Sequence, residues 1–315
     1  MVKTVTKKNV KVLDNINGVA KKNRLSVLKT FKIYIGGKFP RTESGRYYEL
    51  KDSSGNLLAN MCLSSRKDFR NAVVAARGAF GPWADRAAFN RSQILYRIGE
   101  MLEGRRAQFV DELMQMGSSK SSAEQEVDLS VDRLIYYAGW CDKYTQIFSS
   151  VNPVASAHFN FSVPEATGVV AAIASESTGL LGLVSVIAPV IAGGNSIITL
   201  ASETKALCAV SFAEVINSSD IPGGVVNIIT GKEDELYEHM STHMDVNSLV
   251  YSGSNAEHLK TIQVNAADNV KRILDYSKVE WNSEEGQSPY FISDHQETKT
   301  TWHPIENIGG SSSKY

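Results

Sequence analysis

The second half of the chain predicts an α/β fold: a doubly wound, mostly parallel sheet with helices on both faces. Short apolar runs alternate there with helical segments, as crossover connections between parallel strands require. The run from Val169 to Ala174 lacks polar alternation, which is typical of a central strand buried on both faces. Strands are expected at 168–174, 196–201, 225–230, 248–251, 271–276 and 288–293, and helices at 180–192, 205–217, 233–240 and 255–267.

A helical layer is expected before this core. From Ile94 to Met116 the apolar residues return every three or four positions, and Asn90 is placed like a capping residue with Gln93 as its partner. Gly104 is expected to bend or split this helix. A second helix is expected at 122–148, with its own apolar stripe.

Extended segments flank this layer. The alternation at 32–36, followed by two glycines and a second extended run at 47–50, predicts an edge hairpin. The segment 157–163 alternates as an exposed strand does, with Phe159 and Phe161 on one face.

The composition is that of a folded globular protein, with 43% hydrophobic and 21% charged residues in 315. A net charge of -1 creates no broad field for phosphates, so nucleic acid is not expected as a partner. The lysine-rich residues 1–30 lack a secretory apolar core and predict a basic flexible arm. The most apolar run, 180–192, is too short to cross a bilayer. No membrane association is expected.

The three cysteines, Cys62, Cys141 and Cys208, are widely spaced and lack metal-ligand spacing. Neither a disulfide framework nor a zinc site is expected, and a cytoplasmic location follows. Cys141 falls on the apolar stripe of its helix and is interpreted as a core residue. His239 and His243 could share a helix face, but no third ligand is nearby, so no metal is expected.

Five short motifs occur in a fixed order. They are Pro164-x-x-x-Gly168-Val169-Val170, Ala188-Pro189 with Ala192-Gly193-Gly194-Asn195, Ser202-Glu203-Thr204, Ile221-Pro222-Gly223-Gly224-Val225-Val226-Asn227 with Gly231, and Gly253-Ser254. In this order and spacing the chain resembles the aldehyde dehydrogenase superfamily over residues 31–293. It is most similar to the catalytically incomplete second repeat of the family-16 aldehyde dehydrogenases and to the short free-standing bacterial relatives of that repeat.

This resemblance implies an NAD site made by Glu203, Gly231, Gly253 and Ser254. A helix that opens after a parallel strand presents free N–H groups to a phosphate, which suits Gly253 and Ser254. The carboxylate of Glu203 can accept hydrogen bonds from a ribose hydroxyl, as the family's matching glutamate does. The alternative is that Ser254 only caps its helix and that Glu203 only begins the next helix.

Departures from the family pattern predict that NAD binds weakly. Leu200 stands where the family has a lysine that contacts the adenosine ribose, and Glu257 and His258 stand near an expected glycine. Ser177 takes the place of the family's oxyanion asparagine. The loss of one oxyanion donor typically costs about 3 kcal/mol of transition-state stabilisation.

No catalytic residue is expected. The family's general-base glutamate has no counterpart in register, although Glu284 and Glu285 lie nearby. The catalytic domain that carries the family's nucleophilic cysteine is expected to be absent. Without a thiolate no covalent aldehyde adduct forms, and without that adduct there is no hydride donor.

The expected organisation is a basic arm (1–30), a hairpin and helical layer (31–150), an oligomerisation strand remnant (151–167), a Rossmann-like core (168–293) and a C-terminal tail (294–315). The strand at 157–163 is expected to pair with another chain; the alternative is that the tail segment Trp302-His303-Pro304-Ile305 covers it. The favoured function is a non-catalytic structural or regulatory subunit, in a homo-oligomer or with a complete aldehyde dehydrogenase. The alternatives are an NAD-dependent oxidoreductase completed by a partner chain, or a dinucleotide-binding sensor.

Overall fold

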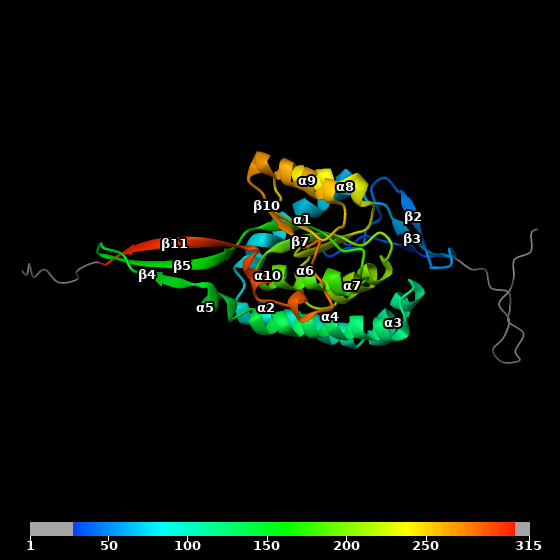
Figure 1. Cartoon of the computed structure of the whole chain (residues 1–315), viewed down its shortest axis with the longest axis horizontal. Helices are drawn as coiled ribbons and strands as arrows, with labels where there is room; N and C mark the ends of the chain where they lie inside the picture. Colours follow the sequence, from blue (N-terminus) through cyan, green and yellow to red (C-terminus); the bar gives the residue numbers. More distant parts are fainter. Residues whose placement is uncertain (1–27, 306–315) are drawn as a thin grey trace, which may run out of the picture.

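The computed structural model describes residues 28–305 and has a five-stranded parallel sheet at its centre (Figure 1). The strands are β6 (Val169–Ile173), β7 (Ser196–Leu200), β8 (Val226–Ile229), β9 (Ser248–Tyr251) and β10 (Arg272–Asp275). Their order across the sheet is β10-β9-β6-β7-β8. Five of the six expected strands and the doubly wound α/β fold are therefore confirmed.

The strand order reverses beside β6. The chain runs outward from β6 through β7 to β8, and then returns to place β9 on the other side of β6. Every residue of β6 and β7 is buried, which explains why these strands carry no polar alternation. Open parallel sheets bind ligands at such a reversal, outside the carboxyl ends of the strands.

Two helical layers cover the sheet (Figure 1). On one face lie α1 (Arg66–Ala84), α8 (Glu233–Thr242) and α9 (Ala256–Ala266), and on the other lie α6 (Leu181–Ala192) and α7 (Leu207–Asn217). Alternate residues of β6 divide between the two cores: Val170 and Ala172 face α6, whereas Val169, Ala171 and Ile173 face α1. The four crossover helices were expected, and α6 is buried all round because further helices cover it.

That outer layer consists of α2 (Ala88–Glu103), α3 (Arg106–Gln115), α4 (Lys120–Trp140) and α5 (Tyr144–Phe148). The predicted split at Gly104 is confirmed, since Gly104 caps α2. The predicted Asn90 cap is wrong. The helix starts at Ala88, and Asn90 instead accepts a 2.8 Å hydrogen bond from Arg86. The helix expected at 122–148 is two helices, α4 and α5, interrupted after Trp140.

The N-terminal hairpin differs from the prediction. Strand β2 (Tyr47–Lys51) pairs with β3 (Leu57–Cys62), and β1 (Thr30–Phe31) pairs with β3 in parallel. The short turn between β2 and β3 decides this pairing, because the Asp52 carboxylate accepts hydrogen bonds from the backbone N–H groups of residues 54 and 56. Residues 32–36 make only isolated bridges. Helix α1 was not identified in the sequence, although Ser65 and Asp68 form a capping box at its start.

A three-stranded antiparallel arm projects from the body (Figure 1). Its strands are β4 (Ser150–Asn152), β5 (His158–Ala166) and β11 (Gln296–Pro304), in the order β11-β5-β4. The expectation that the segment 157–163 lies at a free edge is wrong, because β11 pairs with all of β5. Strand β11 pairs with β5 in preference to a second chain because it belongs to the same chain and is therefore present at a high effective concentration. Its threonines also favour strand structure.

The strand expected at 288–293 is also wrong. Its last four residues form the short helix α10 (Tyr290–Ser293), with Pro289 at its start. A short apolar run suits a strand or a buried helix equally, and the proline favours the helix. The predicted basic arm lies almost wholly in residues 1–27, which are outside the described residues. The part of the predicted tail after residue 305 is also outside them. Between residues 28 and 305 no helix is both long and apolar enough to cross a membrane.

Candidate ligand cleft at the carboxyl ends of the strands

A cleft of about 310 Å³ opens beside the reversal of strand order. Its apolar wall comes from the ends of β6 and β7, where Ile173, Ala174, Leu200 and Ala201 line the cleft. The remaining lining is mostly polar and comes from three loops and the starts of α8 and α9: Glu176, Glu203, Thr204, Gly231, Glu233, Asp234, Asn255 and His258. This is the edge of the sheet where doubly wound proteins bind ligands.

The structure brings together part of the predicted site. Glu203 and Gly231 line the cleft, and Gly253 and Ser254 lie in the adjoining turn between β9 and α9. Gly253 has no room for a side chain, since a Cβ atom there would lie 2.6 Å from the Tyr251 hydroxyl. Ser177 lines a separate cavity of about 210 Å³. The cofactor roles of these residues stay predictions.

The start of α9 is capped by Asn255 and not by Ser254. The Asn255 side chain accepts hydrogen bonds from the N–H groups of Glu257 and His258, at 3.0 and 3.4 Å. The alternative in which Ser254 caps this helix is therefore wrong. Asparagine and serine cap helices about equally well, so only the backbone geometry decides between neighbouring candidates.

His258 is tied to the acidic wall of the cleft. Its Nδ1 lies 2.6 Å from Glu233 Oε1 and its Nε2 lies 3.3 Å from Asp234 Oδ1. The imidazole ring stacks on Tyr237 with centroids 4.1 Å apart. The Tyr251 hydroxyl also donates to Glu233, at 2.8 Å. The histidine is thus held by internal carboxylates on both ring nitrogens.

Glu176 is one of several cleft residues, with Glu233, Asp234 and Asn255, that no sequence motif indicated. It lies in the turn after β6, and its carboxylate accepts from the Glu203 N–H at 2.7 Å and the Thr204 N–H at 3.2 Å. The hydroxyls of Ser202 and Thr204 donate to it as well, each at 2.7 Å. The only available signal was an acid placed directly after a central strand.

The cleft is strongly acidic. Four carboxylates line it, from Glu176, Glu203, Glu233 and Asp234, and none of its described lining residues is a lysine or an arginine. Burial raises the pKa of the Glu203 carboxyl, an effect that the Glu176 charge adds to and that Lys232 opposes. For NAD, Glu203 offers the expected acceptor for a ribose hydroxyl. The pyrophosphate does not fit this lining, because like charges repel within a few ångströms.

The side of the molecule around Ser177 shows no activated nucleophile. The Ser177 hydroxyl lies 2.8 Å from that of Ser175, and the N-terminus of α6 is already bound by Glu126. All three cysteines are buried, and burial raises the pKa of the Cys141 thiol to about 12 and that of Cys208 well above its usual value. The interpretation of Cys141 as a core residue is confirmed.

The two acids near the expected general-base position lie outside the cleft. Glu284 and Glu285 start a short 3-10 turn and do not line the cleft. Among residues 28–305 no group of three or more histidine, cysteine or acidic side chains is placed to hold a metal ion.

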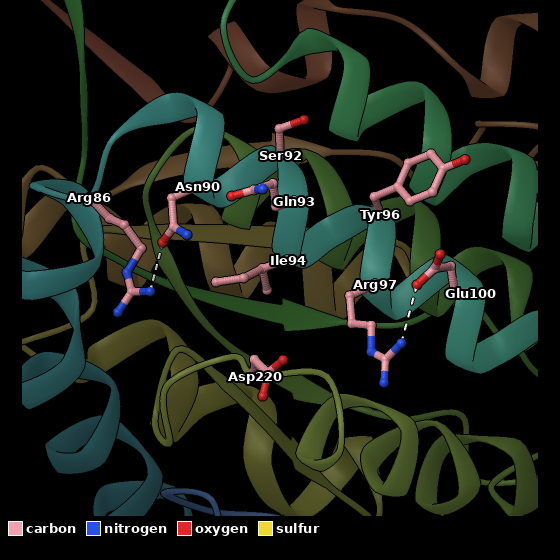
Figure 2. Close-up of a pocket in the computed structure, with 9 residues that line it drawn as sticks. All are labelled: Arg86, Asn90, Ser92, Gln93, Ile94, Tyr96, Arg97, Glu100 and Asp220. Atoms are coloured by element: carbon pink, nitrogen blue, oxygen red, sulfur yellow. Dashed lines mark hydrogen bonds and ion pairs between the residues drawn. The ribbon is translucent and has the colours of Figure 1, made fainter.

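A second, more open cleft of about 730 Å³ lies between α2 and the turn after α7 (Figure 2). Figure 2 shows Asp220 low in the view, between Arg86 on the left and Arg97 on the right, with Arg86 bound to Asn90 and Arg97 bound to Glu100. Asp220 precedes β8, so this cleft lies toward the amino ends of the strands. It contains none of the predicted site residues.

A doubly wound sheet with a cleft at its reversal defines a class of α/β proteins that bind ligands at that point. The family model "Aldehyde dehydrogenase family" matches residues 40–276. The chain therefore belongs to the aldehyde dehydrogenase family. Its closer likeness to the second repeat of the family-16 proteins stays a prediction.

Known relatives support this membership. The putative aldehyde dehydrogenase DhaS of Bacillus subtilis is 30% identical over 249 residues, which are 78% of this chain and 50% of DhaS. Mitochondrial 10-formyltetrahydrofolate dehydrogenase of Homo sapiens is 28% identical over 80% of this chain and 28% of its own length. The structure of an NAD+ complex of aldehyde dehydrogenase from Bacillus cereus superposes with a TM-score of 0.75 at 25% identity, covering 78% of this chain and 50% of that one. The chain thus spans half or less of the length of these relatives.

Proposed function

We propose that this chain is a non-catalytic, aldehyde dehydrogenase-like subunit that associates with copies of itself or with a complete aldehyde dehydrogenase. The observation that carries the proposal is the projecting arm, which has a partly exposed apolar face beside α5. A cytoplasmic location suits the chain, since its three cysteines are free thiols.

The apolar face of the arm follows from strand register. Residues directly opposite in an antiparallel pair point to the same side, so Val151 of β4, which faces Phe161 of β5, extends the row of Phe159, Phe161 and Val163. Phe159 is 46% exposed and Val151 is 68% exposed. These side chains line an open hollow of about 430 Å³. Exposed apolar surfaces of this kind mark sites of protein association.

The free edges of the arm now belong to β4 and β11. Both strands are hydrogen-bonded to β5 on one side only within the described residues. Association through the apolar face, rather than through an edge of β5, is therefore the proposed mode.

Light scattering of the purified protein tests this proposal. We expect a mass above that of one chain, or co-purification with a complete aldehyde dehydrogenase, and loss of either in the double variant Phe159→Asp, Phe161→Asp. The control is Tyr47→Asp with Tyr96→Asp, which changes two exposed aromatic residues away from the arm. A monomeric wild type that copurifies with no dehydrogenase would contradict the proposal.

The non-catalytic part of the proposal rests on the buried thiols and on the occupied end of α6. We expect the purified chain to reduce NAD with an aldehyde no faster than a buffer control. A rate that survives replacement of all three cysteines by serine would favour the oxidoreductase alternative through another nucleophile. A rate that requires an added aldehyde dehydrogenase chain would favour completion by a partner.

The cofactor part of the proposal is that NAD binds weakly. We expect a Kd in the high-micromolar range or poorer, which corresponds to about -5 kcal/mol or weaker. If NAD binding is measurable, Glu203→Ala should weaken it by removing the acceptor for a ribose hydroxyl. Ser254→Pro should weaken it by disturbing the start of α9, where a phosphate would bind. Sub-micromolar binding in calorimetry would instead support the dinucleotide sensor.

A further inference from the structure

Glu176 occupies an anion-binding arrangement inside the cleft. Two backbone N–H groups and two hydroxyls from residues 202–204 converge on its carboxylate, all within 3.2 Å. Donors that converge in this way bind anions well, and here the anion is a side chain of the same chain. An incoming phosphate would have to displace Glu176 to use these donors, or else bind beside its charge.

The rest of the lining does not compensate for this charge. Glu203, Glu233 and Asp234 add three carboxylates, and the one ionisable base, His258, is held by two of them. The N–H groups of Glu257 and His258, in the first turn of α9, are taken by the Asn255 side chain, so these two are not free for a phosphate. A phosphorylated ligand therefore meets four carboxylates, and Lys232, whose charge acts on Glu203, does not belong to the described lining.

An uncharged ligand meets a different surface. Ile173 and Leu200 provide apolar area, His258 provides a ring, and the carboxylates can accept hydrogen bonds from hydroxyl groups. A volume of about 310 Å³ lies at the small end of ligand pockets, which span roughly 300–1,000 Å³. This volume is enough for a ligand the size of a nucleoside.

We propose that Glu176 excludes phosphorylated ligands from this cleft, which therefore binds an uncharged nucleoside in preference to a nucleotide or dinucleotide. This inference deepens the proposal of weak NAD binding and assigns a residue to it. It is independent of the proposed association through the arm.

Calorimetric titration with adenosine, AMP and NAD tests the inference. For the wild type we expect adenosine to bind at least about tenfold more tightly than AMP or NAD, because a phosphate is held within a few ångströms of several carboxylates. In Glu176→Ala, AMP and NAD should gain about tenfold in affinity, since one charge is removed and its donors are released, whereas adenosine should change by less than about twofold. Glu165→Gln is the control, because it removes an exposed carboxylate on the arm.

A second measurement needs no variant. Salt screens exposed charges, so the difference in affinity between adenosine and AMP should narrow as the salt concentration rises on the wild-type protein. The inference is overturned if the wild type binds AMP as tightly as adenosine, if it binds no adenosine, or if Glu176→Ala leaves the ratio unchanged. If adenosine does not bind and the affinity for NAD is low, only this inference is contradicted. If NAD binds tightly, the proposal of weak NAD binding is contradicted as well.

Discussion

The guanidinium of Arg133 on α4 donates a 2.8 Å hydrogen bond to the backbone carbonyl of Trp281. It also donates to the carbonyl of Gly286 and to the hydroxyl of Ser185, and it is almost fully buried. No carboxylate pairs with it among the described residues. One side chain therefore holds the segment 281–286, which departs from the family pattern, against the helical layer.

Replacement of Arg133 should destabilise the fold. Arg133→Met leaves two buried carbonyls and a hydroxyl without a donor, at a cost of about 3 kcal/mol or more in the free energy of unfolding. Arg133→Lys should lose less stability than Arg133→Met but still some, because an ammonium group does not reproduce the planar set of N–H donors of the guanidinium. The control Arg97→Ala removes an exposed pair with Glu100 and should change stability by less than about 0.5 kcal/mol. Urea unfolding measures all three, and a Met variant as stable as the wild type would contradict this account.

Glu126 should stabilise the protein through the start of α6. Its carboxylate accepts hydrogen bonds from the N–H groups of Gly179, Leu180 and Leu181, at 2.8, 2.7 and 3.1 Å. Glu126→Ala leaves these groups without an acceptor and removes a negative charge from the positive end of the helix, for a loss of about 2 kcal/mol. Glu126→Gln should lose less, because an acceptor oxygen remains.

The matched control for Glu126 lies on the same helix. Glu124 is an exposed carboxylate, 3.9 Å from Lys120, and Glu124→Ala should change stability by less than about 0.5 kcal/mol. Thermal unfolding of the three variants separates the two roles. Equal losses of stability in Glu124→Ala and Glu126→Ala would show that Glu126 does not specifically stabilise the start of α6.

His295 should make the protein sensitive to acid. It is completely buried, neither ring nitrogen has a hydrogen-bond partner among the described residues, and burial lowers its pKa to about 3, with Arg272 adding to the shift. Because the folded pKa lies below the unfolded value of about 6.5, the unfolded state binds the proton first. The stability contributed by the neutral ring is present above pH 6.5 and is lost as the pH falls toward 3, by up to about 5 kcal/mol.

The variant His295→Leu should remove this dependence. Between pH 6.5 and 3 its free energy of unfolding should fall less steeply than that of the wild type, whereas His303→Leu, at an exposed position, should follow the wild type. Chemical unfolding at a series of pH values gives the slopes. Parallel curves for wild type and His295→Leu would contradict the assignment.

Much of the core was predictable because its signals are local. The apolar run at 169–174 and the helical spacing of 205–217 depend only on which faces an element buries, and β6 and α7 follow from them. Gly104 split its helix as expected, since a glycine weakens any helix interior. The short motifs were likewise enough to indicate the family.

The sequence by itself determined the sheet, its crossover helices and the edge at which a ligand cleft would form, because each depends on periodicity within one segment. Only the tertiary structure decided what fills that cleft and what covers β5. Glu176 meets the loop after β7 from 26 residues away, and Thr300 of β11 reaches Ser162 of β5 across 138 residues. Contacts of this kind depend on which distant backbones approach each other, and no local pattern of residue types records that approach.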